Sequence, residues 1–310
     1  MKTPCWSMDE ILSSLSEGKE GCGPKSLVMY SSLRGAMVTD PRGMFLPIED
    51  HLVHRGDGVF ETLLFEGGGV YNLSAHLERL IRSASAIGLS LPFGEAQVIQ
   101  VIEDCFAQAG KSRSLARVLL GRGTGGFSVD PAESVQSSLY VMVYEAPPPF
   151  MTTHPEGARA VLSAVPPKSG GLATIKTCNY IPNAMMKAEA NAAGVHFAIG
   201  VDAEGFVTES ATENIAGVDR EGTLIYPPPT SHLPGTTLQR VVALAASEGR
   251  KIENRAFRPS ELFEMAEVLV VGTTTYVTPL IELDGRAISV GPVAGELHRL
   301  LMADIYNREE

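Results

Sequence analysis

The sequence contains few of the features that would assign it to a specialised class of protein. It has only four cysteines, Cys5, Cys22, Cys105 and Cys178, and no two of them are close enough for metal-ligand spacing. No stretch approaches the roughly 18 consecutive apolar residues of a membrane span. The first 18 residues include acidic side chains and lack the apolar core of a signal peptide. We therefore expect a cytoplasmic protein with reduced cysteines.

Basic residues are also in the minority. The 25 Lys and Arg residues against 36 Asp and Glu residues give a formal net charge of −11. Because no dense Lys/Arg stripe is present, we expect no nucleic-acid partner. The remaining composition, 44% hydrophobic and 20% charged, excludes disordered, collagen-like and coiled-coil architectures. A chain of this length can bury a large core, and two domains are expected.

The clearest candidate for a domain boundary is the proline-rich segment EAPPPFMTTHPEG, residues 145–157. Three consecutive prolines exclude a central strand and a helix interior, so the segment is predicted to be an extended linker. Residues 139–145 before it and 158–165 after it are typical of strands. We therefore predict an N-terminal extension (1–27), a small domain (28–146), a linker (147–157) and a large domain (158–310).

Strand and helix patterns follow one another in mixed order. Residues 58–73 are typical of a hairpin with a glycine-rich turn. Amphipathic helices are predicted at 74–87, with Ser74 as N-cap and Gly88 just past the end, and at 95–110. The second half predicts strands at 195–202, 206–210, 214–219, 223–227 and 268–272, and a helix at 236–249. This mixture favours an α+β fold over a doubly wound sheet.

Lysine is scarce, and one lysine lies in an unusual context. The lysines of the chain are Lys2, Lys19, Lys25, Lys111, Lys168, Lys176, Lys187 and Lys251. Lys176 differs from the others because its segment, GLATIKTCNYIP, is largely apolar. Burial lowers the pKa of a lysine and makes it a nucleophilic amine, which Schiff-base chemistry requires. The alternative is a lysine at a strand end that extends to solvent.

Two glycine-containing segments are candidates for binding an anion. In LPGTTLQR (233–240), the start of a helix offers free N–H groups, two hydroxyls and the positive end of the dipole. The alternative is that Thr236 simply caps this helix. GRGTGGFS (121–128) lacks the Lys and Ser/Thr that complete a P-loop, and it is more simply interpreted as a loop.

Two charged residues complete a possible cofactor site. Arg79 shares with His76 and Ser83 the helix face opposite the leucine stripe, where it could bind a phosphate or face solvent. Glu209 follows a strand-like segment, where it could pair with a protonated ring nitrogen or cap a turn. Each feature is weak alone. A Schiff-base lysine, a phosphate cradle, an arginine and a carboxylate together indicate pyridoxal phosphate.

Six ordered segments carry a family resemblance: HRGDGVFETLLF, HLERLIRSA, IKTCNYIPNAMMKAEA, GFVTESATENIAG, LPGTTLQR and VGTTTYVTPLIELDG. They resemble the motifs of class IV (fold type IV) pyridoxal-phosphate aminotransferases, from about Tyr30 to about Leu301. This family includes branched-chain and D-amino acid aminotransferases and 4-amino-4-deoxychorismate lyases. The resemblance implies two α/β domains with pyridoxal 5′-phosphate at their interface, a homodimer, and no metal.

The resemblance also implies roles for individual residues. Lys176 corresponds to the lysine that forms the Schiff base with the cofactor and then moves the substrate proton. Glu209 corresponds to the acid that keeps the pyridine nitrogen protonated. The residues that match the other cofactor ligands are Arg79, Thr237 and Thr273 at the phosphate, the N–H of Thr236 beside them, Leu233 on the ring face and Tyr180 at the ring hydroxyl.

Substrate choice is less constrained by the motifs. The Arg-x-His carboxylate trap of D-alanine enzymes is missing, because Phe127 and Val129 stand at the matching places. A substrate carboxylate entering a partly desolvated pocket needs charge-assisted donors. The residues available for the substrate are Arg117 and the N–H groups of Thr274 and Thr275 for its carboxylate, and Phe60 for an apolar side chain.

We therefore expect an aminotransferase that moves an amino group between an amino acid, with an apolar side chain favoured, and a 2-oxo acid through Lys176. An aminodeoxychorismate lyase that releases pyruvate and 4-aminobenzoate is the alternative, since GRGTGGFS resembles the loop of those enzymes. A D-amino acid aminotransferase is the second alternative. It is suggested by MYSSLRGAMVTDP and DHLVHRGDGVFET, which resemble a branch of D-amino acid enzymes in plants and some bacteria. The expected partners are small molecules, with no membrane.

Overall fold

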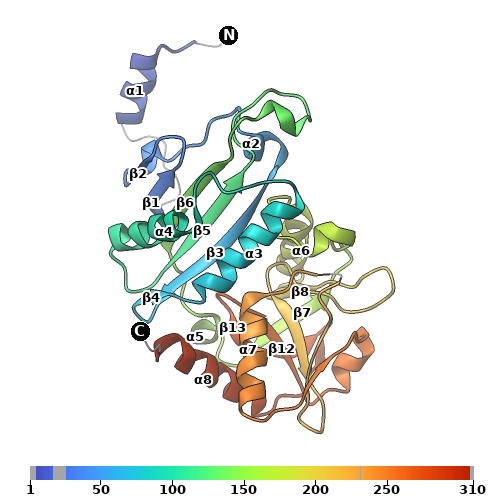
Figure 1. Ribbon diagram of the computed structural model, residues 1–310. Coiled ribbons are helices and arrows are strands. Elements are labelled where there is room, and N and C mark those ends of the chain that lie inside the picture. The colour runs from blue at the N-terminus through green and yellow to red at the C-terminus, as the bar shows by residue number, and fades with distance from the viewer. Residues whose placement is uncertain (1–4, 17–25, 231, 308–310) are drawn as a thin grey trace.

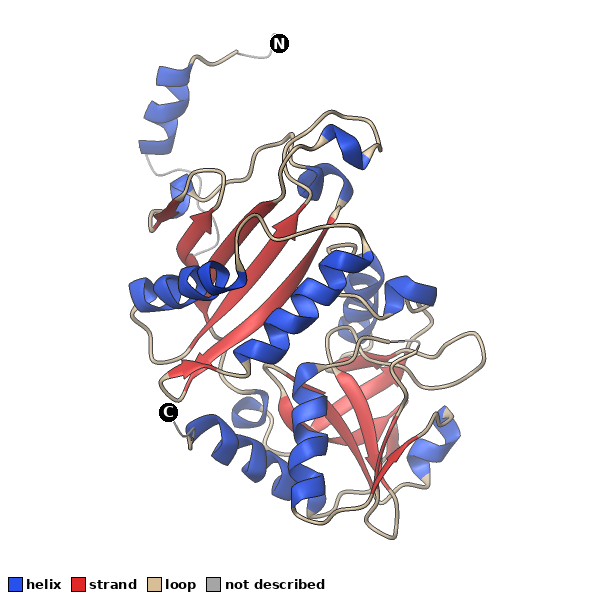
Figure 2. Ribbon diagram, in the orientation of Figure 1, coloured by secondary structure: helices blue, strands red, loops and turns tan. Residues whose placement is uncertain are grey.

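The computed structural model describes residues 5–16, 26–230 and 232–307 of the chain (Figure 1). The described residues form two β-sheets, each flanked by helices, in the mixed order that an α+β fold predicts. Figure 2 shows the two sheets as separate units, the first in the upper part of the view and the second at the lower right. None of the described helices combines the length and the apolar character that crossing a bilayer requires.

The first sheet is built from the N-terminal half of the chain. Its strands are β1 (Ser26–Ser31), β2 (Ala36–Val38), β3 (Gly58–Glu66), β4 (Gly69–Val70), β5 (Ser114–Gly121) and β6 (Ser138–Glu145). They pair antiparallel in the order β2-β1-β6-β5-β3-β4. Helix α3 (Leu73–Ala86) packs on β3, and α4 (Glu95–Ala109) packs on β1 and β6. Their apolar stripes bury a core that includes Leu63, Leu80 and Phe106.

The second sheet follows the proline-rich segment. Its strands are β7 (Ala158–Leu162), β8 (Phe197–Ile199), β9 (Asn214–Val218), β10 (Leu224–Tyr226), β11 (Ile252–Asn254), β12 (Glu267–Gly272), β13 (Tyr276–Leu283) and β14 (Arg286–Ala287). The order is β11-β10-β9-β12-β13-β7-β8, with β14 paired to β13. Helix α7 (Thr236–Ser247) packs on β12, and α8 (Val293–Tyr306) packs on β12 and β13. Helix α6 (Ile181–Ala192) packs on β8.

The remaining helices are short or peripheral. They are α1 (Met8–Ser16), α2 (His51–Arg55), α5 (Phe150–Thr153) and the 3₁₀ turns at Pro41–Gly43, Pro131–Glu133, Gly170–Ala173 and Pro259–Phe263. Helix α5 interrupts the segment that was predicted to be wholly extended. Its N-cap is Pro149, and a proline at that place removes no hydrogen bond from the helix interior.

Two local predictions are wrong. Ser74 is not the N-cap of α3, because the chain leaves β4 through a tight turn with Asn72 at φ 53° and the helix begins at Leu73. Asparagine tolerates this left-handed conformation better than most residues. Residues 206–210 form single bridges rather than a strand, namely Val201 with Val207 and Glu209 with Asn214. Gly88 follows the C-cap of α3 at φ 65°, as predicted.

The cysteine prediction is tested at three of its four positions. Cys5, Cys105 and Cys178 are free thiols, while Cys22 lies outside the described residues. Cys105 is buried in the core of the first sheet. Burial raises the pKa of the Cys105 and Cys178 thiols to about 12, so both stay protonated at neutral pH.

Candidate active site

Two adjoining pockets lie where the first sheet meets the second. The wide pocket, of about 290 Å³, is lined by β3 and β5 on one side and by the β12–β13 turn on the other. The narrow pocket, of about 40 Å³, extends toward the N-terminus of α7 and Glu209. The residues that line both pockets are Arg79, Lys176, Tyr180, Thr212 and Thr273. The two pockets therefore form one continuous candidate site.

Lys176 stands between the two pockets and is only 9% exposed. Its segment is tied to β3, because Phe60 N–H donates to the Lys176 carbonyl (2.9 Å) and Val59 bridges with Thr177. Its own N–H donates to Ser83 Oγ on α3 (3.2 Å). Lys176 Nζ lies 3.3 Å from Tyr180 Oη and 4.8 Å from the centre of the Phe60 ring. Lys176 is thus held by the backbone of β3 rather than placed at a strand end.

The environment of Lys176 favours a reactive amine. Burial, reinforced by the positive charge of Arg79, lowers the pKa of Lys176 to about 8. An ordinary lysine at neutral pH is almost entirely protonated, whereas a pKa near 8 leaves a useful fraction as the neutral nucleophile. The neighbouring Tyr180 keeps its proton, because burial raises the pKa of its hydroxyl.

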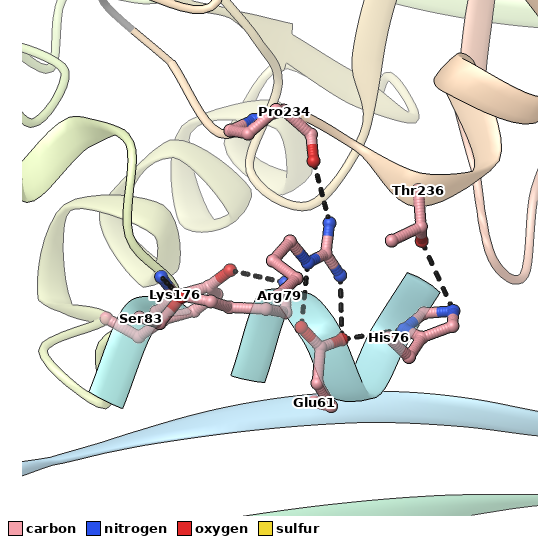
Figure 3. A network of polar contacts seen from close by, with 8 residues as sticks. Glu61, His76, Arg79, Ser83, Lys176, Pro234 and Thr236 are labelled. Atoms are coloured by element: carbon pink, nitrogen blue, oxygen red, sulfur yellow. Dashed lines mark hydrogen bonds and ion pairs between the residues drawn. The ribbon is translucent and has the colours of Figure 1, made fainter. Parts of the chain in front are cut away.

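A buried ionic network positions Arg79 (Figure 3). The guanidinium donates from Nε and Nη2 to the two carboxylate oxygens of Glu61, each at 2.7 Å, and from Nη1 to Pro234 O at 3.1 Å. His76 Nδ1 contacts the same carboxylate at 2.7 Å, and His76 Nε2 contacts Thr236 Oγ1 at 3.2 Å. The network therefore connects β3 and α3 to the start of α7.

The charges within this network are fixed by their neighbours. Burial alone would raise the pKa of Glu61, but Arg79 and His76 outweigh it and bring that pKa to about 2. Burial lowers the pKa of His76, so the ring is neutral at neutral pH. Glu61 occupies the Nε–Nη2 edge of Arg79, and this leaves hydrogens on Nη1 and Nη2 available to an anion.

The N-terminus of α7 faces the narrow pocket with unused donors. Its N-cap is Gly235, in extended conformation, and no side chain caps the helix. The Thr236 hydroxyl contacts His76 rather than capping the helix, so the capping alternative does not hold. A Cβ at Gly235 would lie 1.7 Å from Asn214 Oδ1, a distance that only glycine avoids. Thr236 and Thr237 line the pocket beside it, and the arrangement suits an anion.

Glu209 is a buried carboxyl group at the narrow pocket. It lies on the irregular segment 206–210, and one of its oxygens accepts a hydrogen bond from Leu233 N–H at 3.3 Å. Burial raises the pKa of Glu209 to about 7, although the positive charges of Lys176 and Lys168 act in the opposite direction. A ligand group that carries a proton would find an acceptor here.

The wide pocket combines apolar and cationic side chains. Phe60 and Arg117 project from β3 and β5, and the Arg117 guanidinium lies 4.6 Å from the centre of the Phe60 ring. Thr273 and Thr274 of the β12–β13 turn line the opposite wall. Thr275, predicted beside them, is buried and does not line this pocket.

The loop after β5 does not contribute to either pocket. Phe127 and Val129 are 70% and 88% exposed, and neither lines the wide or the narrow pocket. The loop is attached elsewhere, since His51 Nε2 contacts Gly126 O at 2.8 Å and the rings of His54 and Phe127 lie 5.2 Å apart. In the described part of the chain, no group of three or more His, Cys, Asp or Glu residues could hold a metal ion.

Sequence reasoning selected many of the polar residues of the site but missed others. Thr212, which lines both pockets, was not selected, and neither were Glu61 and Asn214. Glu61 had a visible signal, because a carboxylate inside the apolar run GVFETLLF is rarely buried without a cationic partner. For Asn214, no signal in the sequence indicated a role in a site. Its amide donates to Leu233 O at 2.9 Å and so shapes the loop in front of Gly235. His76 and Ser83 were noted only as sharing the face of Arg79, and both contact the site.

Known proteins resemble the chain over most of its length. A sequence profile described as Amino-transferase class IV matches residues 58–283. The chloroplastic D-amino-acid transaminase of Arabidopsis thaliana is 32% identical over 292 residues, covering 91% of this chain and 78% of that protein. The bifunctional aminodeoxychorismate lyase / D-amino acid transaminase of Mycobacterium tuberculosis is 29% identical, covering 86% and 96%. A branched-chain amino acid aminotransferase from T.th., solved with pyridoxamine 5′-phosphate, is 26% identical with a TM-score of 0.85, covering 92% and 96%.

Proposed function

The chain belongs to the class IV aminotransferases, and from this premise we propose that it moves an amino group between an amino acid and a 2-oxo acid, using pyridoxal 5′-phosphate. The observation that carries the proposal is Lys176, a buried lysine with a lowered pKa that lies between an anion-binding helix terminus and a second pocket. Such an amine is suited to a carbonyl group delivered by a phosphate-bearing ligand.

The residues of the narrow pocket fit pyridoxal 5′-phosphate. Gly235 leaves space at a helix terminus where a Cβ would collide with Asn214, and the free N–H groups there suit a phosphate. Arg79, Thr237 and Thr273 would add donors to the phosphate. The other residues that we propose for the cofactor are the N–H of Thr236, Leu233 against the ring, Tyr180 at the ring hydroxyl and Glu209 at the ring nitrogen.

Each side chain then has a defined task. When bound, the cofactor supplies an electron-withdrawing ring that stabilises negative charge on the substrate Cα. Lys176 Nζ would act as the base that takes up and gives back the proton of the substrate Cα, since it is the amine at the junction of both pockets. Tyr180 Oη, 3.3 Å from Nζ, orients the amine. Glu209 holds a proton on the ring nitrogen, and Arg79 with the α7 terminus fixes the phosphate.

The wide pocket suggests the substrate class. Arg117 offers a charge-assisted donor to a carboxylate, with the N–H group of Thr274 as a further donor, and Phe60 provides an apolar wall. We therefore propose amino acids with apolar side chains as donors. A D-amino acid aminotransferase is a second candidate, favoured by the 32% identity to the plant D-amino-acid transaminase. Residues 121–128 line neither pocket, and their position therefore adds no support for a lyase.

A labelled-donor assay distinguishes these activities. The purified protein, saturated with pyridoxal 5′-phosphate, is incubated with ¹⁵N-labelled L- or D-amino acids and with 2-oxoglutarate or pyruvate. We expect the label in a new amino acid, with Leu, Val or Met the best donors. A separate arm supplies aminodeoxychorismate without an acceptor. Release of 4-aminobenzoate there, with no label transferred in the first arm, would replace the aminotransferase by the lyase.

The domain organisation and the assembly are part of the same proposal. Strand β6 ends at Glu145 and β7 begins at Ala158, so residues 147–157 connect the two sheets. We propose that they link a small domain (28–146) to a large domain (158–310), preceded by residues 1–27. We also propose a homodimer in the cytoplasm. Light scattering on the purified protein tests the dimer, because a monomer of 33.1 kDa is readily distinguished from a dimer.

A further inference from the structure

The turn between β12 and β13 has an unusual residue at its end. Gly272 and Tyr276 pair across the hairpin, so Thr273–Thr275 form a three-residue loop. Hairpins of this length commonly end in a residue with positive φ, and glycine is the usual choice. Here the residue is Tyr276, with φ at 54°. A bulky residue keeps this conformation only where its surroundings fix it.

The surroundings of Tyr276 come from the other sheet. The side chain is 1% exposed, and its hydroxyl donates to Glu66 Oε2 at 2.5 Å. Arg113 Nη2 donates to the same hydroxyl at 3.2 Å, and Arg113 Nε lies 3.4 Å from the Glu66 carboxylate. The ring of His298 on α8 meets the Tyr276 ring edge-on, at 5.9 Å between centres. The strained residue is thus fixed by an apolar cluster that includes Leu64, Leu115 and Leu297, and by a partly buried ion pair from the ends of β3 and β5.

This contact connects two walls of the wide pocket. Glu66 ends β3, the strand that contributes Phe60 to the pocket. Tyr276 immediately follows the turn that contributes Thr273 and Thr274 to the opposite wall. A displacement of the Tyr276 backbone would therefore be transmitted directly to the turn. The Glu66–Tyr276 contact therefore links the end of the turn to the end of β3.

We propose that Tyr276 is a positioning residue, whose hydrogen bonds to Glu66 and Arg113 hold the Thr273–Thr275 turn where its donors face the pockets. The consequence for catalysis rests on the proposed function, because that function places the cofactor phosphate at Thr273 and the substrate carboxylate at the turn. The mechanical part does not, because the contacts of Tyr276 with Glu66 and Arg113 are made by protein atoms alone. The two parts can therefore be tested separately.

The experiment compares Tyr276→Phe with a matched control. Tyr276→Phe removes the hydroxyl but keeps the ring, and it leaves a bulky residue at the position with positive φ. The control is Tyr306→Phe, because the Tyr306 hydroxyl donates to the other oxygen of the same Glu66 carboxylate at 2.6 Å but comes from α8, away from the turn. Hydrogen–deuterium exchange of amides 272–277 measures the turn itself in each purified protein saturated with pyridoxal 5′-phosphate.

We expect Tyr276→Phe to accelerate exchange of the turn amides about ten-fold or more, as the loss of a hydrogen bond to a charged group implies, whereas Tyr306→Phe leaves it unchanged. The dissociation constant of pyridoxal 5′-phosphate and the KM of the best donor should each rise about ten-fold, with kcat reduced less than KM is raised. Glu66→Gln, whose amide oxygen still accepts from the phenol, should retain more of this affinity than Glu66→Ala. These two variants also test the contact from the other sheet if Tyr276→Phe does not fold.

Two results would overturn the proposal. One is unchanged turn exchange and unchanged cofactor affinity in Tyr276→Phe with only a lower melting temperature, which would reduce Tyr276 to a packing residue. The other is equal effects of Tyr276→Phe and Tyr306→Phe, which would assign the effect to Glu66 alone. Faster turn exchange in a protein that transfers no amino group would instead support the positioning role and reject the proposed function.

Discussion

Glu61 allows a quantitative test of the network that positions Arg79. The carboxylate is buried and accepts three contacts at 2.7 Å, two from Arg79 and one from His76. Its pKa is about 2, against an ordinary value of 4.5. Since one pKa unit corresponds to about 1.4 kcal/mol, the ionised form contributes about 3 kcal/mol to stability. Removing one member of a buried ion pair costs about 3–5 kcal/mol, which agrees in magnitude.

The perturbation is Glu61→Gln, which keeps the shape and removes the charge. We expect its free energy of unfolding in urea to fall by about 3 kcal/mol at pH 7. A carboxyl group whose pKa is lowered by folding stabilises the fold at pH values above its pKa in the unfolded chain. The stabilisation by Glu61 is therefore complete above about pH 4.5 and is lost as the pH falls toward about 2. The difference in free energy of unfolding between the variant and the natural protein should therefore become smaller below pH 4.

The matched control is Glu78→Gln, since Glu78 lies on the exposed face of the same helix α3. It should change the free energy of unfolding by less than about 0.5 kcal/mol. Circular dichroism at pH 7, 4 and 3 follows both variants. If Glu61→Gln unfolds like the natural protein at pH 7, or if the difference does not depend on pH, the account of this network is wrong.

Three further substitutions test the cofactor site. Arg79→Ala should weaken pyridoxal 5′-phosphate binding roughly ten- to a hundred-fold in a fluorescence titration, through loss of a charge-assisted contact; unchanged affinity would make Arg79 purely structural. Gly235→Ala should also weaken binding, since its Cβ would displace Asn214, and its effect should exceed that of Gly94→Ala, where an extended helix N-cap like Gly235 has nothing near the added carbon. Glu209→Gln should retain the cofactor but slow amino transfer sharply, because the ring nitrogen loses its anionic partner; near-normal turnover would remove Glu209 from the mechanism.

The sequence predicted those parts of the fold that depend on local pattern. Helices α3, α4 and α7 and the β3–β4 hairpin follow from apolar periodicity and turn glycines, and the structure has all of them. Ser74 was misplaced as an N-cap because a left-handed Asn72 and the tight exit from β4 decide where α3 begins. Residues 206–210 alternate like a strand, but they pair only through single bridges.

The polar residues of the site could be selected from sequence only where their type was unusual in its context. Lys176 stood out because lysines are few and its neighbours are apolar. Glu61 pairs with Arg79, 18 residues along the chain in α3, whereas Tyr276 pairs with Glu66, 210 residues away. The first pair depends on how α3 packs on β3 and the second on which strand and turn the two sheets bring together, and spacing along one sequence contains no information about either.

Borohydride reduction of the purified protein with pyridoxal 5′-phosphate tests the central claim most directly. Reduction fixes a carbonyl–amine linkage in place, and mass spectrometry of the digested protein identifies the lysine that carries the cofactor. We expect the reduced cofactor to be attached to Lys176 and to neither Lys168 nor Lys187. We also expect Lys176→Ala to lose both this attachment and amino transfer. Labelling of another lysine, or full amino transfer by Lys176→Ala, would contradict the account.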